Sequence, residues 1–273
     1  MLKGVRAMKI LAVDTATSCQ SVAILEGKSV LAHVEQDAQG SHAKWLVLSI
    51  DAALQAAGLR LHEMNGLAIS IGPGSFTGLR VGLATLLGFR TALGMPLVAV
   101  PTLEAMAWNM RTTEGTVCPI LRSRKHEIYW AMYQWVSDHR LHRLVSEQIG
   151  APESLARSID APLTAFGDGW VANAQEIRDC LGSRATLIRE AAPTTATRPL
   201  AISVGLAAGQ RFASGQIEGV GVAPLYVQRS EAEMKYEERG RISPGERLKQ
   251  RVAKRTQRKG GRPPVDRKRQ GTA

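Results

Sequence analysis

The sequence predicts an α/β protein in which short buried strands alternate with helices. Strand-sized apolar runs, bounded by turn residues, recur along the chain, and helix-length segments with apolar faces separate them. The first third reads as three strands, a helix, a strand, a helix, a strand and a helix, and a second series of strands begins near residue 117. Such alternation is typical of sheets with parallel strands that helices cover.

The composition indicates a neutral folded body with a basic tail. The chain has 273 residues, 44% of them hydrophobic, which suits one large domain or two ordinary ones. Its net charge is +11, and residues 239–273 alone carry +11, because they hold 13 Lys or Arg and two acidic residues. Three separated cysteines form no disulfide or metal pattern. With no bilayer-length apolar run and no signal-peptide pattern, we expect a cytoplasmic protein without membrane contact, starting at Met1 or Met8.

The first element is a predicted three-strand meander over residues 9–13, 21–25 and 30–34. The turn after its first strand carries Asp14, Thr15, Thr17 and Ser18. Their hydroxyls and the backbone N–H groups, beside one carboxylate, suit a nucleotide phosphate and, through Asp14, a hydrated Mg²⁺. An ordinary Asx-type hairpin turn explains the same residues.

The most distinctive motif is Gly72-Pro73-Gly74-Ser75-Phe76-Thr77-Gly78, between a strand at 67–71 and a helix at 79–93. Gly72 and Gly74 permit backbone conformations that a Cβ would forbid, and Ser75 or Thr77 can cap the helix. The free N–H groups at the helix start attract anions, unless the motif is only a tight connection. It is not a Walker loop, because no Gly-Lys-Ser/Thr follows.

The helix at 79–93 is apolar on nearly every face and rich in glycine. Each glycine costs roughly 1 kcal/mol relative to Ala, which makes sense where another backbone approaches closely. The helix therefore lies either under a subunit contact or between the sheet and its neighbours.

The remaining predicted elements are a helix at 42–57, a strand at 97–100, a helix at 102–111, strands at 117–121, 127–136 and 163–166, helices at 151–156, 171–181 and 200–212, and an extended segment at 220–227. We divide the chain into a first lobe at 8–111, with 220–230 as its candidate completion, a second lobe at 112–219, and a tail at 235–273.

The tail is expected to be disordered in the free protein. A helix over residues 247–257 would have Leu248 and Val252 as nearly its only apolar residues, so it could not bury enough surface to fold alone. Tails of this charge bind polyanions such as RNA. Its RNA-binding candidates are Arg247, Lys249, Arg251, Lys254, Arg255, Arg258 and Lys259. Residues 239–273 contain no aromatic side chain, which argues against base stacking by that stretch, and a solubilising extension is the alternative.

Four segments of the chain closely resemble the TsaB (YeaZ) family: Met8–Ser18, Gly72–Gly82, Glu127–Trp130 and Val222–Arg229. The resemblance covers about residues 8–230, and the Gly-Pro-Gly-Ser-Phe-Thr-Gly block is its most specific part. It implies an actin, Hsp70 and sugar-kinase-like (ASKHA) fold, with two lobes that each hold a mixed sheet flanked by helices.

The resemblance also implies a function. TsaB-like proteins are understood as non-catalytic scaffolds in the synthesis of N6-threonylcarbamoyladenosine at position 37 of tRNA. They pair with the catalytic paralogue TsaD, and with themselves when alone, through helices of the first lobe, and the ATPase TsaE joins the complex. We therefore expect no cofactor of the chain's own, with ATP or ADP and Mg²⁺ acting at the level of the complex. The expected interface consists of Trp45, Leu46, Ser75, Phe76, Leu79, Val81, Gly82, Leu83, Leu86 and Phe89.

Two further observations bear on catalysis. The active paralogue holds its metal through a His-x-x-x-His pair, whereas no two of the six histidines here are four residues apart, so we expect neither a metal site nor catalytic residues. Arg122-Ser123-Arg124 stands where family members commonly have Asp-Ala-Arg. The alternatives to a non-catalytic scaffold are an ATPase or phosphotransferase of the same fold and a tRNA-binding accessory protein that acts through its tail.

Overall fold

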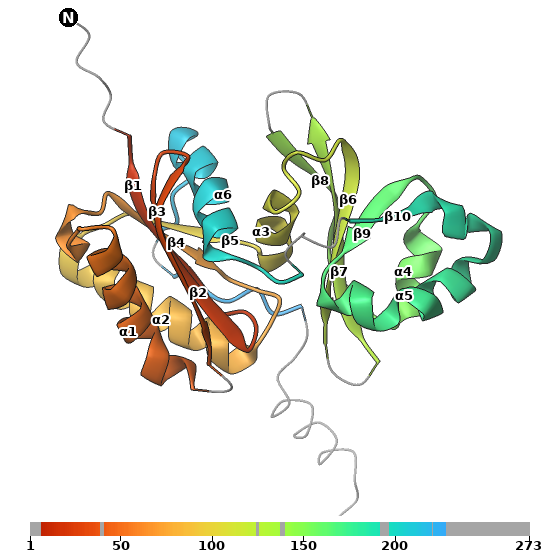
Figure 1. Cartoon of the computed structure of the whole chain (residues 1–273), viewed down its shortest axis with the longest axis horizontal. Coiled ribbons are helices and arrows are strands. Elements are labelled where there is room, and N and C mark those ends of the chain that lie inside the picture. Colours follow the sequence, from red (N-terminus) through yellow and green to blue (C-terminus); the bar gives the residue numbers. More distant parts are fainter. Residues whose placement is uncertain are drawn as a thin grey trace, which may run out of the picture. The chain divides into compact units, whose positions relative to one another are not determined.

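The computed structural model describes residues 7–38, 41–123, 126–136, 140–191, 197–219 and 221–227. These residues form two mixed five-stranded sheets, each flanked by helices, as the sequence predicts (Figure 1). The expected disorder of the tail and its seven RNA-binding candidates lie outside the described residues.

The first sheet has the strand order β3-β2-β1-β4-β5. Its strands are β1 (Lys9–Asp14), β2 (Cys19–Glu26), β3 (Ser29–Asp37), β4 (Gly66–Ser70) and β5 (Leu97–Val100). The first three form the predicted antiparallel meander, whereas β4 and β5 run parallel to β1. The carboxyl ends of β1 and β4 therefore meet at one edge, where the turn at Asp14–Ser18 and the glycine motif at 72–78 come together.

The second sheet repeats this topology. Its strands are β6 (Gly115–Arg122), β7 (Ile128–Val136), β8 (Arg140–Gly150), β9 (Leu163–Phe166) and β10 (Ile188–Glu190). Strands β6, β7 and β8 pair antiparallel, β9 runs parallel to β6, and β10 runs parallel to β9. In each sheet the third strand lies at one edge and is followed by the second, first, fourth and fifth strands, so both sheets have the same strand order.

Helices cover both faces of the first sheet. Helices α1 (His42–Ala56) and α2 (Phe76–Leu93) pack on the face that contains Leu11 and Val13, whereas α6 (Ala201–Ala213) packs on the face of Ile10 and Ala12. Successive residues of β1 therefore point to opposite faces of the sheet, as expected for a β-strand. Helix α3 (Thr102–Trp108) lies between α6 and strands β6 and β7, so α3 and α6 fill the space between the sheets (Figure 1).

The outer face of the second sheet is covered by α4 (Pro152–Ser158) and α5 (Asp168–Leu181). Two short 3₁₀ helices, Leu61–Glu63 and Gly182–Leu187, complete the described helices. No helix in the described part of the chain is long and apolar enough to cross a membrane.

Several element boundaries differ from the sequence-based expectations. Strand β8 was not expected, because it is a polar edge strand without an apolar run, and β10 has only three residues. Helix α3 ends at Trp108, three residues earlier than predicted. Helix α5 begins at Asp168, three residues before the predicted start at 171. The helix at 79–93 begins at Phe76, with the side chain of Ser75 accepting the Gly78 N–H at 3.2 Å as its cap.

A bidentate ion pair links α3 to α6. Arg211 on α6 donates to both carboxylate oxygens of Glu104 on α3, at 2.9 and 2.7 Å, and to the backbone carbonyl of Ala99. Burial raises the pKa of Glu104, and Glu147 on β8 raises it further, against the lowering effect of Arg211. This pair therefore places one well-matched charge contact at the junction of the two lobes.

Candidate functional site

The turn between β1 and β2 is buried at its centre. Asp14 has no exposed surface, and one of its carboxylate oxygens accepts the Ala16 N–H at 3.2 Å, which makes an Asx-type turn. Burial raises the pKa of Asp14 to about 6, against the lowering by the Ser70 hydroxyl and the Ala16 N–H. Its second oxygen and the Ser70 hydroxyl nevertheless make no hydrogen bond of regular geometry within the described structure. Asp14 is thus a carboxylate held inside the protein.

The start of α2 closes over this turn. The Ser75 N–H donates to the Ala16 carbonyl at 2.7 Å. A Cβ on Gly74 would overlap the Ala16 carbonyl, and one on Gly78 would overlap the Thr15 carbonyl. The glycines therefore let the helix start lie directly against the turn. In this arrangement neither Asp14 nor Thr15 can reach a phosphate, whereas Thr17 and Ser18 remain partly exposed.

Two glycines of α2 should respond oppositely to substitution. Gly78→Ala should destabilise the chain by about 2 kcal/mol, because its Cβ meets a backbone carbonyl that cannot turn away. Gly88→Ala should stabilise the chain by up to about 1 kcal/mol, because no described atom lies within 4 Å of the added Cβ and alanine favours the helix. Urea denaturation of both variants measures the difference, and equal effects would contradict this account.

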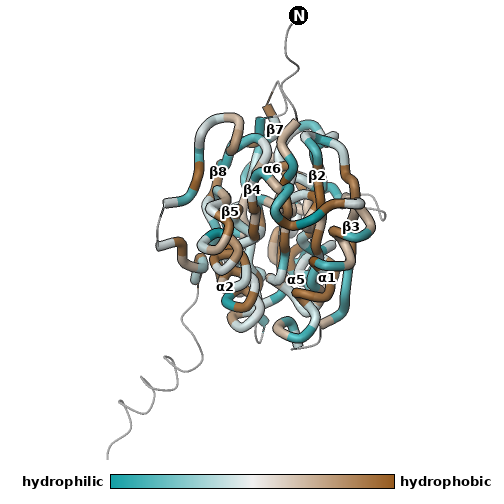
Figure 2. Tube along the Cα trace, turned by 90° about the vertical axis from the view of Figure 1, so that its left-hand side faces the viewer, coloured by the Kyte–Doolittle hydropathy of each residue, from teal (hydrophilic) through white to brown (hydrophobic). Residues whose placement is uncertain are grey.

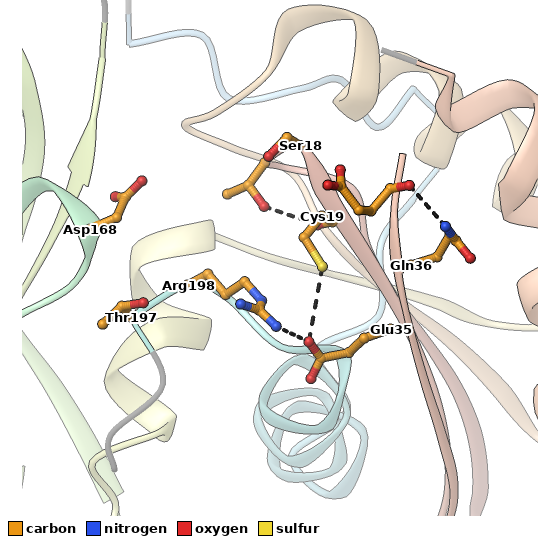
Figure 3. Close-up of a pocket in the computed structure, with 9 residues that line it drawn as sticks. Ser18, Cys19, Glu35, Gln36, Asp168, Thr197 and Arg198 are labelled. Carbon is orange, nitrogen blue, oxygen red and sulfur yellow. Dashed lines mark hydrogen bonds and ion pairs between the residues drawn. The ribbon is translucent and has the colours of Figure 1, made fainter. Parts of the chain in front are cut away.

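A pocket of about 500 Å³ lies between the two lobes beside this turn. In Figure 3, Ser18, Cys19, Glu35 and Gln36 face Asp168, Thr197 and Arg198 from the other side. Its full lining is Thr17, Ser18, Cys19, Glu35, Gln36, Asp37, Asp168, Thr197 and Arg198. Arg198 forms an ion pair with Glu35 across the pocket, so the described segments on its two sides are directly linked.

The pocket does not suit the phosphates of a nucleotide. Three carboxylates, Glu35, Asp37 and Asp168, stand against one guanidinium, that of Arg198. Asp168 also occupies the start of α5, where a phosphate would otherwise find free N–H groups. Its carboxylate instead accepts the backbone N–H of Arg122 at 3.0 Å. Among the described residues, no group of three His, Cys, Asp or Glu side chains could hold a metal ion.

Two histidines and the backbone of Arg122 make contacts within the folded chain. His42 is buried, and its Nδ1 lies 3.3 Å from the side-chain oxygen of Gln20. His33 lies beside Glu35 at 3.8 Å. The backbone of Arg122, which stands where relatives commonly have Asp, touches the pocket through Asp168.

The outer surface of α1 and α2 carries several exposed apolar residues. Val47 and Leu48 on α1 are 54% and 56% exposed, and Leu93 on α2 is 43% exposed. On α2 the small residues Ala84, Gly88 and Ala92 are also exposed, four residues apart and therefore along one row of the helix. Figure 2 looks onto this side and shows apolar segments along both helices.

The structure divides the ten expected interface residues into two groups. The buried residues face the core of the first sheet and cannot touch a partner without unfolding: Leu46, Leu79, Gly82, Leu83 and Leu86. The partly exposed residues are Trp45, Ser75, Phe76, Val81 and Phe89. Helix α2 is therefore not a central helix covered on all sides by its own chain. The row of Ala84, Gly88 and Ala92 was not among the expected interface residues, although its four-residue spacing is visible in the sequence.

Comparisons with known proteins agree on one family. Residues 33–236 match the family model described as "TsaD: tRNA N6-adenosine threonylcarbamoyltransferase". The Escherichia coli (strain K12) "tRNA threonylcarbamoyladenosine biosynthesis protein TsaB" is 32% identical over 170 residues, which cover 60% of this chain and 73% of that protein. The Bacillus subtilis protein of the same description is 25% identical, covering 84% of this chain and 98% of its own.

A solved structure adds the fold. "YeaZ from Pseudomonas aeruginosa" is 26% identical in sequence and superposes with a TM-score of 0.68, covering 80% of this chain and 99% of that one. Together with the repeated strand order, this likeness confirms the two-lobed, actin and sugar-kinase-like fold that the sequence predicts.

Proposed function

The chain belongs to the TsaB (YeaZ) family, and on that premise we propose that it is a non-catalytic scaffold subunit in the synthesis of threonylcarbamoyladenosine in tRNA. In this proposal it pairs with the catalytic subunit TsaD and activates it, and the ATPase TsaE joins the complex. The names of its relatives support a role in threonylcarbamoyladenosine synthesis, and the surface of α1 and α2 supports the pairing with TsaD.

The proposed pairing rests mainly on Gly88, an exposed glycine on α2. Gly78 and Gly74 are needed because the chain's own turn approaches them, but no described atom approaches Gly88. A glycine in a helix costs roughly 1 kcal/mol relative to Ala, so one without an internal contact is best explained by an external one. With Ala84 and Ala92 on the same row, it offers a shallow path along which a partner helix can pack closely, and Val47 and Leu48 add exposed apolar side chains on α1.

The proposal leaves the chemistry to the other subunits. The start of α2 covers Asp14 and Thr15, and the interlobe pocket carries more carboxylates than cations. Both features oppose a nucleotide in the place where the sequence suggested one. The same α1 and α2 surface would support self-pairing of the chain when TsaD is absent, because burying exposed apolar side chains against a complementary protein surface is favourable.

Two surface variants test the pairing. Gly88→Trp and Leu48→Glu should each weaken binding to the TsaD of the same organism by at least about 30-fold, the ratio for a residue at the centre of an interface. Neither change touches the core, so the melting temperatures should stay near that of the unchanged chain. Calorimetric titration and a tRNA modification assay with TsaD and TsaE are the measurements.

The control is Val171→Glu on α5, a residue that is 71% exposed and lies in the second lobe. It should pair and support modification normally. Substitutions of Leu83 or Leu86 are unsuitable, since both side chains lie in the core. Normal pairing and modification by both Gly88→Trp and Leu48→Glu would show that this surface is not the interface.

A further inference from the structure

The chain passes between the two lobes at two places that lie side by side. The first passage follows α3 and begins at Asn109, and the second leads from β10 to α6 and includes Thr197 and Arg198. The side chain of Asn109 joins them. Its amide nitrogen donates to the Arg198 carbonyl at 3.1 Å, and its oxygen accepts a hydrogen bond from the hydroxyl of Ser203 on α6. The two passages are thus held together at one point.

The second passage is also attached to both lobes. The Thr197 carbonyl accepts the backbone N–H of Asp168 at 2.9 Å, at the start of α5 in the second lobe. The next residue, Arg198, reaches the first lobe through its side chain, which forms an ion pair with Glu35 on β3 (Figure 3). Because β3 is an edge strand, two consecutive residues connect α5 of the second lobe to the edge of the first sheet.

The ion pairs near the two ends of α6 differ in burial. Arg211 and Glu104 are 23% and 18% exposed, whereas Arg198 and Glu35 are 44% and 32% exposed. A rise of 1.5 Å per residue places Arg211 about 15 Å along the helix from Ala201 at its start. Removing one partner of an exposed pair shifts an equilibrium by at most about fivefold, far less than for a buried pair. The contact at Arg198 is therefore the one that opens more readily.

We propose that Arg198 and Glu35 form a releasable clamp that sets the angle between the two lobes and thereby the width of the interlobe pocket. When the clamp opens, the lobes turn about the buried contacts of α3 and α6, and the pocket walls move apart. The charges of the lining favour this, since without the guanidinium the carboxylates of Glu35 and Asp37 face that of Asp168 across the pocket. The clamp goes beyond the proposed function and does not depend on pairing with TsaD.

The three cysteines provide a test within the chain itself. Cys19 lines the pocket beside the clamp, is partly exposed, and has its sulfur 4.0 Å from the carboxylate of Glu35. Cys180 on α5 is exposed, and Cys118 on β6 is buried. The rate at which a neutral reagent alkylates Cys19 therefore reports the opening of the pocket. Cys180 is the reference for the reagent, and modification of Cys118 would reveal unfolding.

Charge and opening have opposite effects on Cys19 when Arg198 is replaced. Burial raises the pKa of Cys19, and the positive charge of Arg198 lowers it. Because the thiolate is the reactive form, loss of that charge alone would slow alkylation. Opening of the clamp would speed alkylation about two- to fivefold, the shift expected from an exposed ion pair. Arg198→Met keeps much of the length of the side chain beside the thiol, so a faster reaction indicates opening.

The experiment treats the full chain with iodoacetamide at pH 8 and follows each cysteine by peptide mass spectrometry. Arg198→Met should raise the alkylation rate of Cys19 about two- to fivefold, while Cys180 keeps its rate and Cys118 stays unmodified. Arg60→Met is the matched control, because it breaks an exposed ion pair that lies entirely within the first lobe. It should leave the Cys19 rate unchanged.

A distance between the lobes separates their motion from local uncovering of the thiol. Spin labels on Asp51→Cys in α1 and Val171→Cys in α5, both exposed positions, mark one lobe each in a full chain that carries Cys19→Ser and Cys180→Ser. Adding Arg198→Met should broaden the distance distribution toward longer distances. The proposal is overturned if Arg198→Met slows the alkylation of Cys19 or leaves its rate unchanged, or if the interlobe distances with and without Arg198→Met coincide.

Discussion

Replacing Arg211 by Met should destabilise the chain by about 3–4 kcal/mol, which lies within the range expected when one partner of a buried ion pair is removed. The two side chains are only 23% and 18% exposed, and the guanidinium holds both oxygens of Glu104. Without it, Glu104 stays buried near Glu147, whose negative charge adds to the effect of burial in raising the pKa of Glu104. The free energy of unfolding, obtained from urea denaturation at pH 7, is the measurement.

The double variant Arg211→Met, Glu104→Met is the control for this prediction. It removes both charges and replaces them with apolar side chains, so it should recover most of the lost stability. The deficit of the single variant should also shrink as the pH falls, because a proton then neutralises Glu104. A loss of less than about 1 kcal/mol in the single variant would show that the pair does not hold α3 to α6 in solution.

Replacing Asp14 by Asn should make the chain more stable at neutral pH. The pKa of Asp14 is raised from its ordinary value of 3.8 to about 6 by burial. The folded protein therefore holds this proton more tightly than the unfolded chain. The stability that the neutral carboxyl provides is complete below pH 3.8 and is lost as the pH rises through about 6. A difference of about two pH units corresponds to about 3 kcal/mol.

The measurement is the difference in unfolding free energy between Asp14→Asn and the unchanged chain from pH 5 to pH 8. It should grow in favour of the variant as the pH rises and level off above pH 7. Asp160→Asn, at an exposed aspartate, is the control for the substitution itself. A flat profile for Asp14→Asn would contradict the buried, charged state.

The same variant separates the scaffold from a nucleotide-using enzyme. If Asp14 held Mg²⁺ and phosphate, the unchanged chain would bind Mg²⁺ and ATP in calorimetry and Asp14→Asn would lose that binding. The buried turn predicts no such binding by either protein. Micromolar binding that disappears in the variant would favour the phosphate interpretation of Asp14, Thr15, Thr17 and Ser18.

The local elements of the first lobe could be read from the sequence because each one carries its own signal. Buried strands such as β1 and β4 are short apolar runs, and α2 has a serine cap and an apolar face. Strand β8 gave no such signal, because an edge strand with one solvated face keeps few apolar residues. The start of α5 was missed because Gly167 and Gly169 also occur in loops.

The candidate site could be predicted only in part. The glycine motif and the Asp14 turn stood out, but their contact with each other joins residues about 60 positions apart, and no local pattern encodes it. The same holds for the pocket, whose lining comes from the ends of β2 and β3 and from residues 168 and 197–198. The Phe76 and Tyr226 contact spans 150 residues.

The sequence by itself determined the α/β class, the neutral body and the basic charge of the tail, because composition and local periodicity carry these properties. It also indicated the family, through the four segments that resemble it. Only the tertiary structure decided what each glycine of α2 is for. Gly78 makes room for the turn that holds Asp14, whereas Gly88 faces outward with no described neighbour within 4 Å of its missing side chain. The two are alike in the sequence, and they differ because packing, which assigns each helix face to core or to surface, depends on segments far away along the chain.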